Sequence, residues 1–388
     1  MNVPCLSSPD SAVGRTVAEL ASAPDRPLDG IESFAYRFGR VYDAYLAVEQ
    51  DRSQFWSRNR RGVAAYVRTG KYLNVSGGLL AAEADRETLL AEFVEFADRH
   101  RWSPSFYNIA EAELPLFRKF GFQATKWGEE GIVDLQRRSW GGNEFAWVRR
   151  QSSYCRRHGV EIAECLPGAM AKREWNRLKT ELCEISAAFL AAKPQAAELR
   201  FLVGSLDLEH LGRRRLFVAR RDGDAGRVEG FLLCNPYRDG QGWAFEIYRH
   251  RPDAVRGTIP FLMHRTMQIL QSEGLRQVSL CLSPGLRSGE PLSGDSALVR
   301  RGLAIGSRYF SAIFDAAGLY HFKSRFRPRF ESRYVCVRPK ATLGSSWALA
   351  RLLGVLKLDS RKLGRVLCDR LRKAARRKTL ATPRDSAD

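Results

Sequence analysis

The sequence predicts an α/β protein made of two copies of one unit, followed by a basic helical tail. The first observation is a repeat: short apolar runs typical of strands alternate with amphipathic segments in the same order twice. The second is uneven charge, because residues 338–388 hold fourteen Lys and Arg against four Asp and Glu, half of the net charge of +20. We therefore divide the chain into a disordered N-terminus, a first unit, a second unit and a tail, at 1–30, 31–139, 140–340 and 341–388.

The first unit is predicted to contain two strands, a helix, a strand, a helix and a closing strand. Apolar residues at i, i+3 and i+4 indicate the first helix, and Gly121 stands where a left-handed residue commonly ends the second. The predicted elements, in order, are 62–67, 72–80, 83–101, 106–109, 112–119 and 131–135.

The second unit repeats this order after a bridging segment, 140–190, that is predicted to be largely helical. Its strands are predicted at 215–219, 228–234, 243–248, 277–282 and 332–337, with helices at 258–273 and around 319–326. A strand hairpin, a helix, a strand, a helix and a closing strand is the order of a GNAT-type acyltransferase domain. The repeat thus predicts two GNAT-like domains in tandem, and this analogy of fold does not identify a substrate.

Composition excludes some classes of protein. The eight cysteines include no C-x-x-C pair, and several lie in apolar runs such as 231–234 and 278–281, which indicates buried reduced thiols in a cytosolic protein. No secretory signal opens the sequence, and no run reaches the roughly 18 to 20 apolar residues that span a bilayer. The sequence predicts a protein that is soluble or bound to a surface.

The tail has the pattern of basic amphipathic helices. Leucines at 349, 352, 353 and 356, and apolar residues at 363, 366, 367 and 371, recur at helical spacing opposite many Arg and Lys. Such a helix is typical of a membrane-surface element that binds anionic lipid. The alternative is that the apolar stripe packs on the body and leaves only the basic face free.

Several motifs occur in order along the body. They are Phe117-Arg-Lys-Phe-Gly-Phe-Gln-Ala-Thr-Lys-Trp-Gly-Glu-Glu130, Val228-Glu-Gly-Phe231, Phe245-Glu-Ile-Tyr-Arg-His-Arg-Pro-Asp253 and Gly318-Leu-Tyr-His-Phe-Lys-Ser-Arg-Phe-Arg-Pro-Arg-Phe-Glu331. Together they resemble the C-terminal catalytic domain of the lysyl-phosphatidylglycerol synthases, and the resemblance extends over 34–339.

The resemblance implies transfer of an aminoacyl group from aminoacyl-tRNA to a hydroxyl of a membrane lipid such as phosphatidylglycerol. It implies aminoacyl-tRNA and an anionic membrane lipid as partners, no cofactor or metal, and a cytoplasmic protein bound peripherally to the inner face of the cell membrane. Full-length members carry an N-terminal flippase region, and we expect this chain to be a form without it. The donor ester is already activated, so the site has to position the hydroxyl, accept its proton and stabilise an oxyanion.

The resemblance also implies which residues form the site. Glu246, Arg249 and Lys323 are the expected catalytic residues, with Glu246 holding the amino group and the two cations binding phosphate or developing negative charge. Because residues three apart on a regular strand face opposite sides, this arrangement requires a bulge after Phe245. The expected substrate-binding residues are Arg325, Arg327, Arg329, His264, Arg149 and Arg150.

Other interpretations stay open at this point. The pair of Glu246 and Arg249 also fits a surface ion pair, and the basic residues at 323–329 fit the solvated face of an ordinary element. Residues 257–260 and 76–80 lack the carboxylates that the family carries there, which is compatible with another amino acid, another acceptor or lost activity. The two alternative functions are an acyl-CoA-dependent GNAT N-acyltransferase, although no CoA-binding loop is found, and a non-catalytic relative that binds RNA or membranes.

Overall fold

The computed structural model describes residues 30–192, 200–222, 226–288, 292–303 and 316–353. The predicted disorder of residues 1–29 and the predicted second tail helix lie outside the described residues. The α/β class and the repeated order of elements are confirmed, and Gly121 has the expected left-handed conformation, with φ of 76°.

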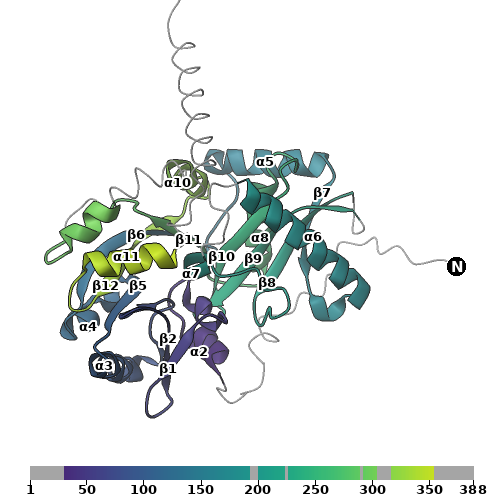
Figure 1. Cartoon of the computed structure of the whole chain (residues 1–388). Helices are drawn as coiled ribbons and strands as arrows, with labels where there is room; N and C mark the ends of the chain where they lie inside the picture. The colour runs from purple at the N-terminus through teal and green to yellow at the C-terminus, as the bar shows by residue number, and fades with distance from the viewer. Residues whose placement is uncertain (1–29, 193–199, 223–225, 289–291, 304–315, 354–388) are drawn as a thin grey trace, which may run out of the picture.

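Twelve strands form one continuous mixed sheet through the whole body (Figure 1). The order across it is β1-β2-β3-β5-β12-β6-β11-β10-β9-β8-β7, with β4 beside β2. The strands are β1 (Ser53–Trp56), β2 (Gly62–Thr69), β3 (Tyr72–Val75), β4 (Leu80–Ala81), β5 (Ser103–Ala110), β6 (Gln123–Asp134), β7 (Val160–Cys165), β8 (Arg215–Arg221), β9 (Arg227–Tyr237), β10 (Gly242–His250), β11 (Gln277–Pro284) and β12 (Arg329–Val337).

Helices cover both faces of this sheet. In the second half, α5 and α8 pack on one face and α6 on the other, around two separate apolar clusters. In the first half, the predicted apolar side of α3 is buried against the sheet. The helices are α2 (Ile31–Phe38), α3 (Glu83–Arg99), α4 (Leu114–Lys119), α5 (Ala146–Arg157), α6 (Lys172–Ala191), α7 (Arg200–Val203), α8 (Thr258–Ser272), α10 (Ala316–Ser324) and α11 (Leu343–Leu352), with a 3-10 turn η1 (Ala44–Val48).

The same strand distortion occurs once in each half. The parallel pair β3 and β5 is hydrogen-bonded only as far as Phe106, and the parallel pair β10 and β11 only as far as Ser279. Two residues further on, Asn108 and Cys281 each adopt a positive φ, 59° and 61°. A left-handed residue within a strand is costly for any side chain, so its presence at equivalent points supports the predicted repeat.

The prediction that residues 332–337 close the second unit is wrong. β12 lies between β5 and β6 of the first half and pairs with both, while β6 pairs on its other side with β11 of the second half. A local apolar pattern predicts that a strand forms, but not which distant strand it joins. The bridging segment also differs from the prediction, because it contains β7, which pairs with β8.

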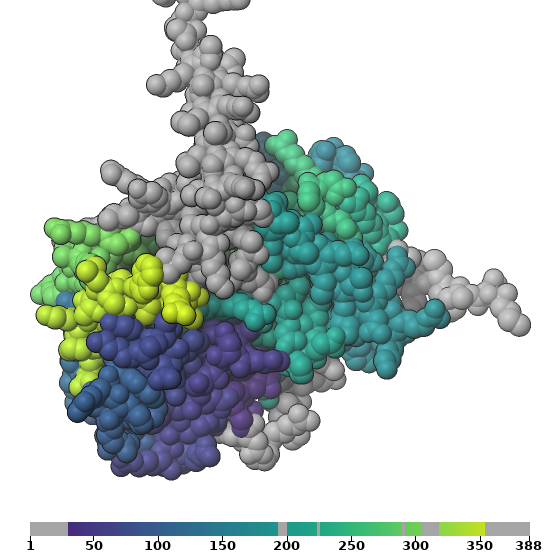
Figure 2. Space-filling view, viewed as in Figure 1, coloured from purple at the N-terminus to yellow at the C-terminus, as the bar shows by residue number. Residues whose placement is uncertain are grey.

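The first tail helix, α11, packs on the body. Thr342 and Ser345 form a capping box at its start, and Ala348 is buried while Leu349 and Leu352 contact the apolar cluster beside β12. For this helix the docked alternative is correct. Leu343 and Trp347 remain 76% and 60% exposed. Figure 2 shows the α11 segment, in yellow, at the surface of the molecule. Among the described residues, no helix is long and apolar enough to cross a membrane.

Because β12 separates β5 from β6, we expect a fragment of residues 31–139 to be unable to fold alone. Its β5 and β6 would expose backbone groups that β12 pairs with in the whole protein. We predict that this fragment is insoluble or unfolds without a cooperative transition in urea, while a chain of residues 31–353 unfolds cooperatively. A soluble 31–139 fragment with one sharp transition would contradict the strand exchange.

Candidate active site

The bulge expected after Phe245 is present in β10, where the pairing with β9 shifts register between Phe245 and Ile247. Phe245 packs in the apolar cluster under α5 and α8, whereas Ile247 packs in the cluster under α6. The extra residue, Glu246, therefore reverses the side of the sheet toward which the following side chains of β10 point. As a result Arg249 lies on the α6 face, where its guanidinium contacts Ser186 and the ring of Phe189.

Glu246 is buried where β10 and β11 diverge. It is 7% exposed, its Oε2 lies 3.7 Å from the Sγ of Cys281, and its Oε1 has no hydrogen-bond partner among the described residues. Burial, and next the charge of Asp43, raise the pKa of Glu246 well above the ordinary value. A cation placed beside this carboxyl group would favour its ionised form, so the site is suited to an ammonium group.

Lys323 approaches the same place from α10. Its Nζ donates to the carbonyl oxygens of Cys281 and Leu282, at 3.0 and 2.9 Å, and lies 3.4 Å from Ser283 Oγ. The side chain is buried, and this burial lowers the pKa of Lys323 to about 8. An amine with this pKa carries positive charge at neutral pH and can also exchange a proton there, which suits oxyanion stabilisation or proton transfer.

A second buried carboxylate, Asp43, comes from the first half. It is 1% exposed, and its Oδ2 accepts hydrogen bonds from Asn108 Nδ2 at 2.7 Å and from the Gly77 amide at 3.3 Å. Its Oδ1 has no hydrogen-bond partner among the described residues. Burial raises the pKa of Asp43 to about 6. The segment 76–80, where the carboxylate expected from the family is missing, thus lies directly against a carboxylate from elsewhere in the chain.

We call Asp43, Glu130 and Glu246 the acidic centre, because they influence one another and Tyr42 electrostatically. Glu130 on β6 is fully buried and accepts a hydrogen bond from Arg333 Nε on β12 at 2.6 Å. The pairing of β6 from the first half with β12 from the second thus brings this ion pair to the junction of the halves. Sequence reasoning missed Asp43. The only local indication is a carboxylate within the apolar and aromatic run 41–47.

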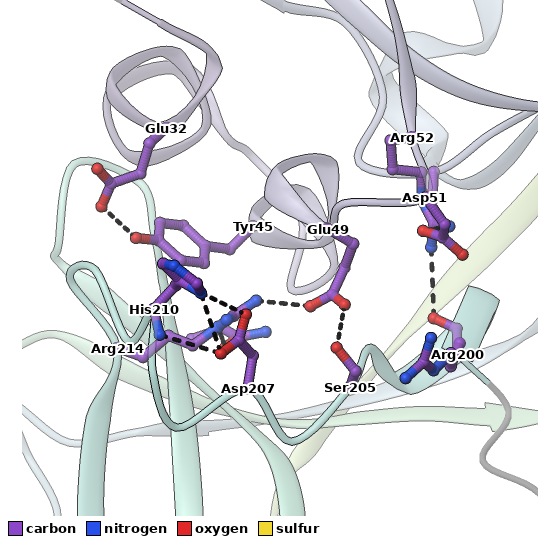
Figure 3. Close-up of polar contacts among 12 residues, drawn as sticks. Glu32, Tyr45, Glu49, Asp51, Arg52, Arg200, Ser205, Asp207, His210 and Arg214 are labelled. Carbon is purple, nitrogen blue, oxygen red and sulfur yellow. Dashed lines mark hydrogen bonds and ion pairs between the residues drawn. The ribbon is translucent and has the colours of Figure 1, made fainter.

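An ion pair between Glu49 and Arg214 joins the two halves (Figure 3). Glu49, which follows η1, accepts a hydrogen bond at 2.7 Å from Arg214, and Arg214 also donates to Asn235 at 3.1 Å. Glu49 and Arg214 line a cavity of about 270 Å³ together with Asp207 and His210. The positive charge of Arg214 also opposes the rise in the pKa of Glu246.

The remaining expected site residues are divided between a buried helix contact and the surface. His264 is 5% exposed, its Nδ1 lies 2.8 Å from Ser152 Oγ, and its ring contacts Trp140, so it lies between α5 and α8. Burial lowers the pKa of His264 to about 4, which keeps it neutral. We infer a structural role for this histidine, because none of its described contacts is with the acidic centre.

The arginines expected to bind substrate lie on α5, directly after α10 and at the start of β12. Arg325 lies over the ring of Trp147 on α5, and Arg149 donates to the carbonyl oxygen of Trp140. Figure 1 shows α5 and α10 side by side. We call this surface the basic surface, and it comprises Arg149, Arg150, Arg325, Arg327 and Arg329. Arg150, Arg327 and Arg329 are exposed, although Arg329 pairs with Glu331 at 2.6 Å.

The N-terminus of α8, the helix that follows β10, is covered by neighbouring side chains. A Cβ on Gly257 would lie 2.7 Å from the side chain of Gln151 on α5, and the buried Glu229 accepts the amide proton of Val255 at 2.9 Å. An anion held by backbone N–H groups at the start of α8 would meet both this carboxylate and α5. The arrangement therefore disfavours pyrophosphate binding there. Among the described residues, no group of three or more His, Cys, Asp or Glu is placed to hold a metal ion.

Six cysteines lie in the described part of the chain, and all six are free thiols. Cys155, Cys165, Cys234 and Cys336 are buried, as the sequence predicts. Cys183 is exposed, and Cys281 is a neighbour of Glu246 rather than a core residue.

The raised pKa of Asp43 gives a test by pH-dependent stability. The ordinary value is 3.8 and the folded value is about 6, so the folded protein loses stability as the pH rises from about 4 through 6. Asp43→Asn keeps the size of the side chain and cannot ionise. We predict that it raises the free energy of unfolding by ~3 kcal/mol at pH 8 and by roughly half as much at pH 5.

Urea unfolding at the two pH values measures this effect. Asp222→Asn is the matched control, because Asp222 has a left-handed φ of 67° and a side chain that is 79% exposed. If Asp43→Asn is less stable than the wild type at pH 8, the ionised carboxylate is compensated in the folded protein and the assignment fails.

Comparisons with known proteins agree with this fold. The family described as "Phosphatidylglycerol lysyltransferase, C-terminal" matches residues 36–337. The chain has the fold of L-PGS from Bacillus licheniformis, with a TM-score of 0.68 and 22% identity over 84% of this chain and 96% of that one. It also resembles the C-terminal domain of a putative lysylphosphatidylglycerol synthetase from Agrobacterium fabrum, with a TM-score of 0.63 and 21% identity over 86% and 93% of the two chains.

Curated relatives include the phosphatidylglycerol lysyltransferases of Bacillus subtilis (strain 168) and Staphylococcus aureus (strain COL). They are 23% and 22% identical over 82% and 85% of this chain. The chain spans only 36% and 38% of their lengths. With the family match covering most of its residues, this chain belongs to the phosphatidylglycerol lysyltransferase C-terminal family.

Proposed function

We propose that this protein transfers an aminoacyl group from aminoacyl-tRNA to a hydroxyl of an anionic membrane lipid such as phosphatidylglycerol. The observation that carries the proposal is the position of α10. Lys323 on this helix extends inward to the β11 carbonyls beside Glu246, and two residues later Arg325 lies on the basic surface. A donor with a reactive end and a polyanionic body needs these two environments next to each other.

The chemistry then uses groups that are present at the junction. Glu246 accepts hydrogen bonds from the α-ammonium of the aminoacyl group and so fixes the ester in place. The acceptor hydroxyl oxygen attacks the ester carbonyl and loses its proton, and the 3′ oxygen of the tRNA leaves with a proton. Lys323 stabilises the negative charge that forms on the carbonyl oxygen. Because the ester is already activated, no covalent enzyme intermediate is needed.

The basic surface provides for the tRNA. Arginine side chains hold phosphate groups bidentately, and the basic surface presents them on α5 and directly after α10, where Arg325 lies over Trp147. The alternative of an acyl-CoA-dependent N-acyltransferase is less well supported, because Gln151 and Glu229 close the start of α8.

Membrane contact is the second part of the proposal, with the protein peripheral on the inner face of the cell membrane. Trp347 and Leu343 are one helical turn apart on α11 and both are exposed, an arrangement that suits the interfacial layer of a bilayer. The residues that follow, 354–388, add a net charge of +7. An apolar pair followed in the sequence by a cationic segment provides both the hydrophobic and the electrostatic contributions to binding at a membrane surface.

Glu246→Gln tests the chemistry. It removes the negative charge that would hold the α-ammonium while keeping the size of the side chain. We predict a fall of about tenfold to 150-fold in kcat/KM for transfer from charged tRNA, which corresponds to the roughly 1.5–3 kcal/mol of a charge-assisted hydrogen bond. Lipid extraction and mass spectrometry measure the product. Glu161→Gln, at an exposed position of β7, serves as control, and undiminished transfer by Glu246→Gln would remove Glu246 from the site.

Truncation after Leu353 tests the membrane contact. It removes the net charge of +7 but leaves α11 and the site in place. We predict that the truncated protein no longer sediments with anionic vesicles at physiological salt, and that the full chain leaves the vesicles as salt rises, since exposed charges are screened over about 8 Å. In the full chain, Trp347→Ala with Leu343→Ala should weaken sedimentation without changing its dependence on salt. Vesicle binding that is insensitive to both truncation and salt would exclude the tail as an anchor.

A further inference from the structure

A cavity of about 310 Å³ that the proposed reaction does not use is lined by residues of both halves. Residues 37–40, at the end of α2 and after it, form one side, and residues 81–83, at the start of α3, form another. The second half contributes Arg238, from the turn between β9 and β10. Three lining residues are arginines, Arg37, Arg40 and Arg238, against one carboxylate, Glu83. The cavity therefore concentrates positive charge, and it shares no residue with the acidic centre or the basic surface.

Arg238 is held at the cavity by a tight turn that docks on the first half. Arg238 and Asp239 both have a left-handed φ, 53° and 55°, a conformation that most side chains disfavour. Their amides donate to the carbonyl oxygens of Gly39 at 2.7 Å and Tyr36 at 3.0 Å, respectively. The Nε of Arg238 also donates to the carbonyl oxygen of Arg40 at 3.3 Å. The turn thus fixes the Arg238 side chain beside the loop that carries Arg40.

Two of the three arginines keep their terminal nitrogens available. Arg40 is ion-paired with Glu83, whereas neither Arg37 nor Arg238 pairs with any carboxylate in the part of the chain that the structure describes. Arg37 instead lies over the ring of Phe38, 5.7 Å from its centroid. A guanidinium group that holds no carboxylate can bind a phosphate group bidentately.

The start of α3 adds to the positive potential of the cavity. This helix has 17 residues, it follows Ala82, and no side chain caps its first turn. The corresponding helix of the second half, α8, has its start covered by Gln151 and Glu229. Backbone N–H groups at the start of a helix favour an anion. The two halves therefore differ, because the helix start beside the arginines borders a cavity and the other one is covered.

We propose that this cavity binds a phosphate group, held by the guanidinium groups of Arg37 and Arg238 with the first turn of α3 beside them. Two sources carry this chemistry: free phosphate or diphosphate, and the phosphodiester of a lipid headgroup. Glu83 opposes binding, because its carboxylate engages Arg40 and repels an anion. The proposal does not depend on the proposed function, because no residue of the cavity takes part in the transfer.

Protection of the arginines from chemical modification tests the proposal in the full chain. Arg37, Arg40 and Arg238 are exposed, so an arginine-selective reagent such as phenylglyoxal reaches them, and peptide mass spectrometry measures each one separately. We expect inorganic pyrophosphate or glycerophosphoglycerol to slow the modification of Arg37 and Arg238 in a saturable way. Chloride at the same ionic strength should not do so. Arg173, an exposed arginine on α6, is the internal control and should react at an unchanged rate.

Two variants with matched controls then assign the charges. Arg238→Gln should raise the concentration that half-protects Arg37 by about tenfold or more, as expected when one charge-assisted hydrogen bond is lost. Arg173→Gln makes the same change in net charge and should leave it unaltered. Glu83→Gln should lower that concentration by about twofold to fivefold, the range of an exposed charge pair, whereas Glu87→Gln, one turn later on α3, should not.

The two probes distinguish the sources of the phosphate group. Protection at lower concentrations of pyrophosphate supports a site for free phosphates, and protection at lower concentrations of glycerophosphoglycerol supports a site for a lipid headgroup. Equal protection of Arg173, or protection that chloride reproduces, would show only general screening of a basic protein and would overturn the proposal. Protection of Arg37 that is unaffected by Arg238→Gln would overturn it as well. The wild-type measurement depends on no variant being folded.

Discussion

The position of β12 between β5 and β6 is the constraint on which the rest of the structure depends. A closing strand from the second half completes the sheet of the first, and β6 of the first half pairs with β11 of the second. One continuous sheet carries backbone hydrogen bonds across the junction and fixes the relative position of the halves. η1 of the first half then packs against β9, the neighbour of β10 in the sheet.

This interleaving also explains how carboxylates become buried at the junction. Asp43 approaches from η1, Glu130 from the exchanged strand β6 and Glu246 from the bulge in β10. Only Glu130 is compensated by direct ion pairing, to Arg333 on β12. Raised pKa values at Asp43 and Glu246 indicate that the fold gives up stability at these positions. Such local costs are concentrated where a protein binds and reacts.

The division between centre and surface fits a reaction between two very different substrates. The acidic centre is small, buried and built of carboxyl groups, and it is suited to the aminoacyl end of the proposed donor. The basic surface on α5 and after α10 and the cationic sequence after α11 are suited to phosphate groups of RNA and lipid. The end of α10 joins these environments, because Lys323 contacts β11 beside Glu246, Arg325 lies over Trp147 and Phe326 is buried.

The sequence by itself determined the class of fold, the repeated order of elements and the candidate residues Glu246 and Lys323. The spacing of apolar residues reflects which side of an element is buried, so helices such as 83–99 and strands such as 277–284 can be predicted from their own residues. The bulge after Phe245 also followed from the sequence, given the requirement that Glu246 and Arg249 share a face. Tertiary structure alone decided the partner strands of β12, the buried position of His264 and the entry of Asp43 into the site. These depend on contacts between residues far apart in the chain, such as Asp43 with Asn108 and Glu130 with Arg333, and local spacing carries no information about them.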